Sequence, residues 1–404
     1  MTDHLKSLIS KLESQISQEP QNNIKRVSKA ISYFKIDFTN IKKIHVAGTN
    51  GKGSVSKYLT EILTDNNYKV GTFVSPYLRV FNERILLNNQ MISDQDLEKY
   101  LTKVLNYNEQ LDVKMSFFEL LTILSFLYFY DQKVDVIIIE VGIGGKLDVT
   151  NTIEYDLSLL TNVGTDHLQK LGPTINDVLM NKLGILKPKG VMLTTLQDTF
   201  KIDALNYANS VGATIKFVDK PLKLSNNPLK FYMYGQEFEL KMLGDFQILN
   251  AALAISACKY LFANIKPEQV KKSIKKAYWP GRLDLVGKNP LVYIDAAHNK
   301  EAAIALTESI NSLFKDKKVV VLMSILKGKD YQGFINELTK ISKRIILTDF
   351  PDPRLADLLE ISKEFKEVEY IKNFKDAVKE LNDKDTVYIV TGSIHFIGYF
   401  LNNY

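Results

Sequence analysis

One glycine-rich segment constrains the fold of this chain more than any other feature: His45-Val-Ala-Gly-Thr-Asn-Gly-Lys-Gly-Ser54. An apolar run, residues 41–47, enters the segment, and apolar residues at helical spacing follow it from Val55 onward. Glycines let successive backbone N–H groups converge on an anion, and a helix that starts there points its positive dipole end at the same anion. The segment therefore predicts a strand, a phosphate-binding loop and a helix, in that order.

Two side chains of this loop suit phosphate binding as well as its backbone does. Lys52 would bring a positive charge to the phosphates, and Ser54 an oxygen for a phosphate or a metal ion. The lysine lies between two glycines, which differs from the common G-x-x-x-x-G-K-[ST] spacing. A glycine-rich turn with a solvated lysine is the alternative interpretation, but the strand before and the helix after it favour a nucleotide. The predicted nucleotide-binding residues are Gly48, Thr49, Asn50, Gly51, Lys52, Gly53 and Ser54.

The segments after the loop alternate between strand-like and helical patterns. The run 134–141 is rich in β-branched residues and is typical of a central parallel strand. This alternation predicts a doubly wound α/β domain with a mostly parallel sheet. Residues 1–40 read as helices that would cover one edge of the sheet, and the polar stretch 77–93 reads as a functional loop. Further strands are predicted at 68–74, 157–161, 191–195 and 214–218, and helices at 94–110, 116–130, 174–187 and 200–211.

A second, smaller α/β domain is predicted after residue 287. The 404 residues exceed what one core usually supports, and turn residues gather at Gly287-Lys-Asn-Pro290. We therefore divide the chain into domains of residues 1–287 and 288–404. Before the boundary, 228–243 alternates like a hairpin, and helices are predicted at 246–262 and 267–276; after it, strands are predicted at 291–295, 318–323, 344–348, 368–371 and 386–391.

Composition narrows the class of protein. The apolar content of 45% and the charged content of 24% are ordinary for a globular protein, and the net charge of +6 comes without a clustered basic stripe. We therefore expect no nucleic-acid partner. Cys258 is the only cysteine, which excludes an intrachain disulfide and a cysteine metal site. No apolar segment is long enough to cross a membrane, and the N-terminus lacks an apolar signal core, so we expect a cytoplasmic protein without a membrane partner. We also expect a monomer.

Polar residues follow several predicted strands, at the edge where open α/β sheets bind ligands. Glu140 lies near the end of the strand 134–141, and a carboxylate beside a phosphate loop suits Mg²⁺, which prefers oxygen ligands. The alternative is a strand-end charge held by a neighbouring backbone N–H. His167 follows the strand 157–161 together with Asp166, and a metal ligand and a solvated histidine are equally open there.

The second domain has polar strand ends of its own. Asp295 and His298 follow its first strand, and Ser393 follows its last strand, where a preceding glycine allows an anion-binding turn. Arg282, near the domain boundary, is either a cation clamp for the same cluster or a surface charge. Lys182, near the end of a helix of the first domain, reads as a surface charge.

The ordered set of motifs resembles a known enzyme family. From residue 44 to about residue 400 the chain is similar to the folylpolyglutamate synthases and dihydrofolate synthases of the Mur ligase superfamily. Each motif is weak by itself, but the ordered set is highly specific. The motifs are His45–Ser54, Ser75-Pro76, Phe81–Ile85, Glu140–Asn151, Thr161–His167, Lys182–Ile185, Gly244–Asn250, Pro280–Arg282, Asp295–Asn299 and Thr391–Ser393.

The resemblance implies an ATP-dependent ligase that joins L-glutamate to a carboxylate of folate. The γ-phosphate of ATP would be transferred to that carboxylate, and the amine of glutamate would attack the resulting acyl phosphate. The domain 1–287 would then bind ATP and Mg²⁺, and the domain 288–404 would be the glutamate-ligase domain. Folate would lie near the loop that contains Ser75 and Arg84.

The resemblance also assigns roles to single residues. Lys182 corresponds to a carbamylated lysine of the family, which would act as a carboxylate-like metal ligand rather than a surface charge. The catalytic residues would be Lys52, Lys182 and His298. The other implied roles are Mg²⁺ ligands for Ser75, Glu140, His167 and Lys182, nucleotide contacts for Asn250, Arg282 and Asp295, and substrate contacts for Arg84, His298 and Ser393.

Three alternatives to folate polyglutamylation fit the sequence to different degrees. Dihydrofolate synthesis from dihydropteroate fits the same motifs, and one chain can do both. A cell-wall Mur ligase fits less well, because we expect its nucleotide-sugar domain before the ATP loop and only 47 residues precede Gly48. A nucleotide switch ATPase is the alternative from a different class, and it would not need the cluster of Asp295, His298 and Ser393.

Overall fold

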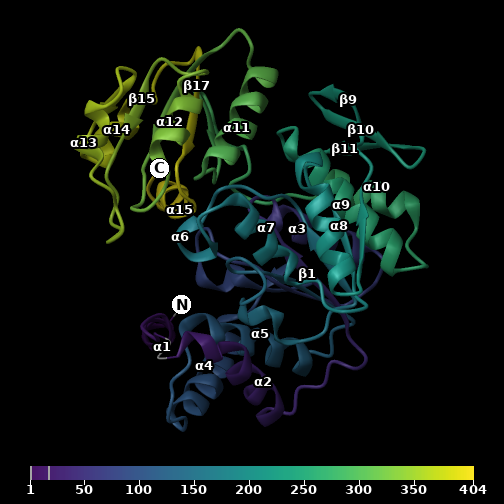
Figure 1. The fold of residues 1–404 in the computed structure, drawn as a ribbon. Helices are drawn as coiled ribbons and strands as arrows, with labels where there is room; N and C mark the ends of the chain where they lie inside the picture. Colours follow the sequence, from purple (N-terminus) through teal and green to yellow (C-terminus); the bar gives the residue numbers. More distant parts are fainter. Residues whose placement is uncertain (1, 17–18) are drawn as a thin grey trace. The chain divides into compact units, whose positions relative to one another are not determined.

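The computed structural model describes residues 2–16 and 19–404. Stretches that alternate along the chain form two compact units (Figure 1). The described residues up to 163, together with 167–220 and 250–273, form the first unit; residues 164–166, 221–249 and 274–404 form the second. The boundary predicted after residue 287 falls inside a strand of the second unit, and as a domain boundary it stays a prediction.

The first unit is built on an eight-stranded sheet of order β4-β3-β2-β5-β1-β6-β7-β8. Neighbouring strands from β2 to β8 are parallel, whereas β3 and β4 are antiparallel. Every residue of β5 is buried, as expected for a strand rich in Val and Ile inside a parallel sheet. The predicted doubly wound, mostly parallel α/β fold is confirmed. The strands are β1 Lys42–Ala47, β2 Val70–Phe73, β3 Ile85–Leu87, β4 Gln90–Met91, β5 Val136–Glu140, β6 Leu157–Leu160, β7 Val191–Thr194 and β8 Thr214–Phe217.

Two apolar clusters hold helices of the first unit to this sheet. One cluster joins the N-terminal helices and α4 and α5 to side chains such as Phe73 and Ile139, and the other joins α7 and α8 to Leu160 and Met192. The helices are α1 Asp3–Glu13, α2 Asn23–Tyr33, α3 Lys52–Asp65, α4 Asp94–Glu109, α5 Phe117–Asp131, α6 Leu168–Leu171, α7 Ile175–Leu183 and α8 Lys201–Ser210, with α9 Phe246–Leu261 and α10 Pro267–Lys276 divided between the units; the short 3₁₀ turns are η1 Pro20–Asn22, η2 Phe81–Arg84, η3 Val149–Thr152 and η4 Asp198–Phe200.

The N-terminal helices differ from the prediction. α1 and α2 pack on α4 and α5 rather than against an edge of the sheet. Arg26 of α2 donates to the fully buried Glu119 of α5, from Nε to Oε1 at 2.8 Å and from Nη2 to Oε2 at 3.1 Å. Because α4 and α5 already cover the sheet, they offer the apolar face on which the amphipathic N-terminal helices are buried. Residues 1 and 17–18 of the predicted helical region lie outside the described residues.

The polar stretch 77–93 was predicted as a functional loop, and this prediction is partly wrong. It contains the turn η2 and the strands β3 and β4, which extend the first sheet. β3 pairs antiparallel with β2, and two asparagines with positive φ, Asn88 and Asn89, form the turn to β4. Asparagine tolerates the left-handed conformation that such a two-residue turn needs, and this local signal was missed.

The second unit contains a six-stranded sheet of order β12-β13-β17-β14-β15-β16. From β13 to β16 the neighbours are parallel, but β12 pairs antiparallel with β13 and was not predicted. The strands are β12 Asp284–Lys288, β13 Leu291–Ile294, β14 Lys318–Met323, β15 Ile345–Leu347, β16 Val368–Tyr370 and β17 Thr386–Thr391; the helices are α11 Lys300–Leu313, α12 Tyr331–Leu338, α13 Leu358–Lys363, α14 Phe374–Lys379 and α15 Ile394–Asn403.

The hairpin predicted at 228–243 is present and has a third strand. β9 Leu222–Asn226, β10 Leu229–Met233 and β11 Gln236–Leu240 form an antiparallel sheet in the order β11-β10-β9. Leu229, Phe231 and Met233 of β10 are buried and alternate with more exposed residues, which is the pattern of a sheet covered on one face.

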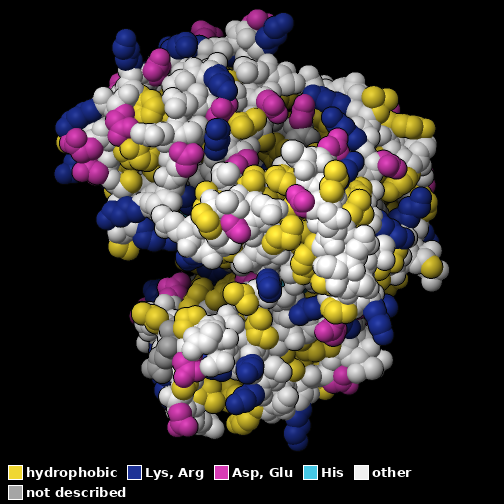
Figure 2. Space-filling view, in the orientation of Figure 1, with side chains coloured by type: hydrophobic (Ala, Val, Ile, Leu, Met, Phe, Trp, Pro, Cys, Tyr) yellow, Lys and Arg dark blue, Asp and Glu magenta, His cyan; other side chains and the backbone are white. Residues whose placement is uncertain are grey.

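Charged side chains of both signs lie on the described surface. Basic and acidic side chains are interspersed on the face drawn in Figure 2. Among the described residues, no helix has the length and apolar character needed to cross a membrane.

Candidate active site

The strand order of the first sheet brings many of the predicted site residues to one edge. β2, β5, β1 and β6 are consecutive neighbours and run parallel, with Phe73 opposite Ile139 and Val46 opposite Glu140. Segments that follow parallel strands lie at their common carboxyl edge. The predicted residues there are Ser75 after β2, Glu140 at the end of β5, Gly48–Ser54 after β1, and Thr161–Val163 and His167 after β6.

The glycine loop is packed so closely that two positions exclude a side chain. Gly51 has a φ of +86°, and a Cβ there would lie 2.3 Å from Oδ1 of Asn250. A Cβ on Gly48 would lie 1.8 Å from Oγ1 of Thr161. Lys52 begins α3, and its Nζ donates to the carbonyl oxygen of Gly48 at 3.0 Å. The ammonium group is therefore held over the loop, where phosphate oxygens are able to replace the carbonyl as its partner.

The exit of β6 fixes the conformation of this loop. Thr161 Oγ1 donates to the carbonyl oxygen of Asn50 at 2.6 Å, and Asn162 Oδ1 accepts from the N–H of Asn50 at 2.9 Å. The N–H of Thr49 donates to the carbonyl oxygen of Asn162 at 3.0 Å. Ser54 is fully buried in the first turn of α3. Residues predicted from two separate motifs thus form one hydrogen-bonded cradle.

The four predicted Mg²⁺ ligands have different surroundings. Glu140 and Lys182 are buried, each only 4% exposed, whereas Ser75 is partly exposed and His167 is exposed with a φ of 60°. The interpretation of Lys182 as a surface charge is wrong, because the apolar side of α7 takes it into the interior. No group of three or more His, Cys, Asp or Glu side chains is gathered as a metal site among the residues that the structure describes. The predicted set holds only two residues of those types.

The turn after β5, residues 142–148, is tied to its surroundings at both ends. Asp148 Oδ2 accepts from the N–H of Ile143 at 3.0 Å. Burial raises the pKa of Asp148, and the hydrogen bonds that it accepts oppose this shift. At the other end, the N–H of Lys146 donates to the carbonyl oxygen of Asn181 in α7 at 2.8 Å. The turn therefore links the end of β5 to the end of α7.

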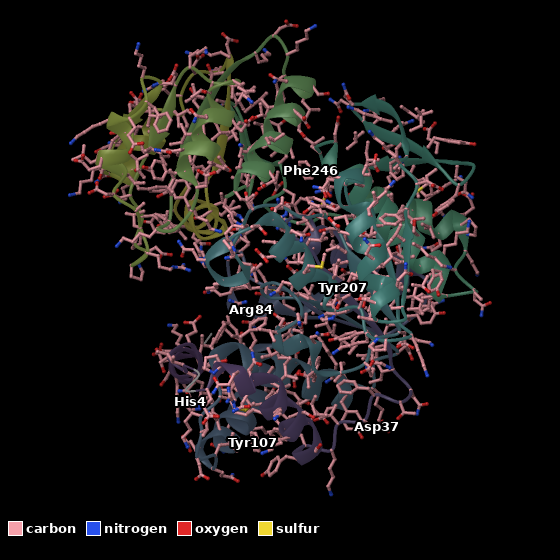
Figure 3. The ribbon with its side chains drawn as sticks, in the orientation of Figure 1. His4, Asp37, Arg84, Tyr107, Tyr207 and Phe246 are labelled. Atoms are coloured by element: carbon pink, nitrogen blue, oxygen red, sulfur yellow. The ribbon has the colours of Figure 1, made fainter. Side chains whose placement is uncertain are left out.

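Arg84, labelled in Figure 3, is a buried cation in an aromatic cage. Its guanidinium carbon lies 4.9 Å from the ring centroid of Tyr77, 5.5 Å from that of Phe81 and 5.3 Å from that of Phe117. The side chain is 7% exposed, Nη1 donates to Ser75 Oγ at 3.4 Å, and Nε has no hydrogen-bond partner. Burial lowers the pKa of Arg84 to about 10, so the group stays charged at neutral pH. A cation held by rings can attract an anionic group of a ligand.

In the second unit, the ends of β13 and β17 meet at one edge. The N–H of Gly392 and Oγ1 of Thr391 both donate to the carbonyl oxygen of Ala297, at 3.0 and 3.2 Å. Gly392 has a φ of +108°, and a Cβ there would lie 2.3 Å from a backbone oxygen, so only glycine fits. Ser393 is buried and caps α15 by accepting from the N–H of Phe396 at 3.0 Å.

Asp295 is buried, and both of its carboxylate oxygens accept backbone N–H groups. Oδ2 accepts from Leu283 at 2.8 Å, and Oδ1 from Ala297 at 2.9 Å. Burial raises the pKa of Asp295, and the charge of Arg282 opposes that shift. Asp295 therefore fixes the segment around Arg282 against β13, a structural role that the sequence-based prediction of a nucleotide contact did not include.

His298 belongs to a charged cluster that also contains Asp166. Its Nε2 lies 3.2 Å from Asp166 Oδ2, and its Nδ1 lies 2.9 Å from the carbonyl oxygen of Ala296. Lys329 Nζ donates to Asp166 Oδ1 at 2.7 Å. Glu301 holds the neighbouring residue, since its Oε1 accepts from the N–H of Thr165 at 2.8 Å. Lys329 and Glu301 were missed as partners, because the sequence gives no signal of which distant residues face Asp166.

The residues present fit a nucleotide with a divalent metal ion. The close-packed Gly48–Ser54 cradle with its lysine suits phosphate groups. The donor set of Ser75, Glu140 and His167 supplies a hydroxyl, a buried carboxylate and an imidazole, which are ligands that Mg²⁺ and Mn²⁺ accept together with water.

Comparison with known protein families agrees with this architecture. Residues 46–258 match the family described as "Mur ligase middle domain", and residues 281–394 match "Mur ligase, glutamate ligase domain". The chain is 34% identical over 384 residues to the dihydrofolate synthase/folylpolyglutamate synthase of Bacillus subtilis, with 88% of this chain and 89% of the relative covered.

Solved structures extend the comparison to the fold and to ligands. The folylpolyglutamate synthase of Mycobacterium tuberculosis, complexed with ADP and AMPPCP, is 26% identical with a TM-score of 0.87, covering 99% of this chain and 98% of that one. A bifunctional folylpolyglutamate synthase/dihydrofolate synthase with Mn, AMPPNP and L-glutamate bound is 25% identical with a TM-score of 0.87, covering 98% and 97%. This chain therefore belongs to the dihydrofolate synthase/folylpolyglutamate synthase family of the Mur ligases, and it is an ATP-dependent ligase.

Proposed function

We propose that this enzyme adds L-glutamate to a carboxylate of a folate, with ATP as the source of energy. The carboxylate takes the γ-phosphoryl group of ATP and becomes an acyl phosphate, ADP leaves, and the free amine of glutamate attacks the acyl carbon. Loss of phosphate from the tetrahedral adduct leaves the amide. The observation that carries the proposal is the glycine cradle with Lys52 at the exit of β1, in a chain that also matches the glutamate ligase domain.

The nucleotide half of the reaction is assigned to residues of the first sheet edge and of the segment that ends at Asp295. When the nucleotide binds, Lys52 Nζ exchanges the Gly48 carbonyl oxygen for a phosphate oxygen and neutralises part of the phosphate charge. A divalent ion, when bound, would offset the charge of the phosphoryl oxygens. We assign the metal to Ser75, Glu140, His167 and carbamylated Lys182, and the remaining contacts of the nucleotide to Asn250, Arg282 and Asp295.

The two acids that become joined are assigned to different side chains. Arg84 presents a caged guanidinium whose Nε lacks a partner, which suits a carboxylate of the folate. His298 and Ser393, with the Asp166–Lys329 pair beside His298, suit the carboxylates of glutamate. In this assignment Lys52, Lys182 and His298 are the catalytic residues.

Dihydrofolate synthesis from dihydropteroate is the second candidate activity. The relative from Bacillus subtilis is named for both activities, and the one from Mycobacterium tuberculosis is named for polyglutamylation alone. The two reactions differ in the acid that is activated and not in the nucleotide chemistry, so the same site supports either. A nucleotide switch is disfavoured by membership of a ligase family.

Phosphate release with defined acid substrates tests the proposal. The purified enzyme is incubated with ATP, Mg²⁺ and either tetrahydrofolate or dihydropteroate, with and without L-glutamate. We expect glutamate-dependent release of phosphate with tetrahydrofolate and a product one glutamate heavier by mass spectrometry. Turnover with dihydropteroate alone would replace the first assignment by the second, and turnover independent of glutamate would contradict both.

Three further expectations remain predictions: a cytoplasmic location, a monomeric state and a domain boundary at residue 287. The single buried cysteine, Cys258, is compatible with a reducing cytoplasm. The monomeric state and the domain division at residue 287 are likewise open to direct measurement, by light scattering and by limited proteolysis.

A further inference from the structure

A buried histidine lies directly before the glycine loop and has no role in the chemistry proposed above. His45 is in β1, fully buried, with its ring stacked on that of Tyr155 at a centroid distance of 4.1 Å and an interplanar angle of 12°. Its Nε2 lies 2.8 Å from Oγ1 of Thr150, and its Nδ1 has no hydrogen-bond partner. Burial of Nδ1 without a partner costs free energy, which directs attention to the hydrogen bond that Nε2 makes with Thr150.

The direction of the hydrogen bonds follows from Asp148. Thr150 is fully buried, and its hydroxyl lies 2.5 Å from Asp148 Oδ1, which also accepts from the N–H of Thr150 at 2.9 Å. The carboxylate accepts, so the single hydroxyl proton of Thr150 points to Asp148. The hydroxyl oxygen then accepts from His45 Nε2–H. The ring is neutral, in agreement with burial that lowers the pKa of His45 to about 3.

This chain of hydrogen bonds ends on the turn 142–148. Asp148 Oδ2 holds the N–H of Ile143, and the same turn is tied to α7 through Lys146 and Asn181. Tyr155 closes the network from the other side, because its hydroxyl donates to the carbonyl oxygen of Thr150 at 2.6 Å. The network therefore connects three elements: β1, which leads into the phosphate loop, β5, which ends in a carboxylate, and α7, which carries a buried lysine.

We propose that His45 is a positioning residue that, through Thr150 and Asp148, sets the spacing between the phosphate loop and the metal-binding side chains Glu140 and Lys182. The proposal rests on the assignment of Glu140 and Lys182 to the metal in the proposed function. His45 touches neither substrate nor metal. Groups hydrogen-bonded directly to metal ligands typically change metal affinity by about 10–100-fold when they are replaced, and because His45 acts through Thr150 and Asp148 we expect the lower end of that range.

Mn²⁺ binding measured without turnover tests this proposal. The variant His45→Phe keeps a ring for Tyr155 to stack on and removes the Nε2–H donor. Electron paramagnetic resonance of free Mn²⁺, with AMPPNP present and no acid substrate, should give a dissociation constant raised about 10-fold or more. His45→Gln places an amide N–H near the lost Nε2–H and should restore affinity to within about 3-fold of the original, a recovery that a purely structural role does not predict.

Two further variants keep the test decisive. If His45→Phe does not fold, Thr150→Val and Thr150→Ser take its place, because Thr150→Val removes the hydroxyl at nearly constant volume and Thr150→Ser keeps the hydroxyl while it removes the methyl group. Ser125→Ala is the control, since Ser125 is also fully buried and donates a hydrogen bond, to Thr122 within α5. Unchanged Mn²⁺ affinity in His45→Phe and Thr150→Val would overturn the proposal, as would equal loss in His45→Phe and His45→Gln.

Glu140→Ala separates this proposal from the function on which it rests. If Glu140→Ala loses Mn²⁺ affinity while His45→Phe and Thr150→Val retain it, only the positioning role fails. If Glu140→Ala itself binds Mn²⁺ like the unmodified enzyme, the metal assignment of the proposed function fails and the positioning role fails with it.

Discussion

In the proposed assignment, the carboxyl edges of the two sheets bind anions in different ways. At the first sheet, the loop Gly48–Ser54 presents backbone groups, and the side chains of Thr161 and Asn162 brace it by hydrogen bonds to the backbone of Asn50. At the second sheet, His298 and Lys329 both contact the carboxylate of Asp166. In that assignment, a phosphate replaces the Gly48 carbonyl as the partner of Lys52, whereas a carboxylate that approaches His298 competes with Asp166.

Because of this difference, we expect activity to respond differently to substitutions at the two edges. At the first edge, the proposed phosphate loop has backbone N–H groups and one lysine, so no other cation of that loop takes over when that lysine is removed. In a cluster of paired charges, the remaining members can take over part of the binding. We therefore expect the largest effects at the first edge and smaller, substrate-specific effects at the second.

Replacement of Lys52 is expected to have the largest effect. Lys52→Ala removes the ammonium group that lies over the Gly48 carbonyl and should lower glutamate-dependent phosphate release by about 10³-fold or more. Lys57→Ala is the matched control on the same helix, because Lys57 pairs with Glu61 and Asn89 instead. Near-normal turnover of Lys52→Ala would remove the phosphate-loop assignment and the proposed contrast between the edges.

Replacement of Glu140 comes next. Glu140→Ala should lower the rate at saturating Mg²⁺ by about 10²-fold and raise the Mg²⁺ concentration needed for half-maximal rate, because a buried metal ligand is lost. A Mg²⁺ titration of the steady-state rate measures both quantities. An unchanged Mg²⁺ response would take Glu140 out of the site.

The pH dependence of stability tests the buried histidine of the first unit, His45. Burial lowers the pKa of His45 from 6.5 to about 3, so the unfolded chain binds more protons than the folded chain between those values. This contribution to stability is present above pH 6.5 and is lost as the pH falls toward 3. Between pH 7 and pH 5 it amounts to about 2 kcal/mol.

Urea unfolding of the unmodified chain and of His45→Gln at both pH values measures that contribution. The variant lacks the titrating group and should lose about 2 kcal/mol less than the unmodified chain between pH 7 and pH 5. Equal losses of unfolding free energy in the two proteins between pH 7 and pH 5 would show that His45 does not control the decrease of stability in acid.

Replacement of His298 should have the smallest and most selective effect. His298→Ala should raise the KM for glutamate about 10-fold and leave the KM for ATP within about 2-fold, because Lys329 remains to attract a carboxylate. The ATP KM of the same variant is the internal control. Equal increases in both KM values would argue against a glutamate role and against the distinction between the two edges.

Much of the fold could be predicted from local patterns. The β-branched run that forms β5 and the Gly-rich loop before α3 specify their structure through burial and backbone freedom alone. The errors arose where long-range packing decides. The helices α1 and α2 were placed at a sheet edge although they pack on α4 and α5, and β12 was missed because an antiparallel edge strand has a weak pattern of its own.

The candidate site divides in the same way. The glycines, Lys52 and Glu140 were enough to predict a nucleotide and metal site, because that chemistry needs those residue types at strand ends. The ligase reaction and the role of His298 came from the resemblance of the ordered motifs to a known family. The sequence by itself therefore determined the class of reaction and the strands that carry it.

Only the tertiary structure decided which residues are buried and which of them meet. It placed Lys182 in the interior, put Lys329 on Asp166, and joined His45 to Asp148 through Thr150. These partners are separated by up to 163 positions along the chain, and a hydrogen bond between such residues depends on how sheets and helices pack. The amino-acid pattern around each residue contains no record of that packing.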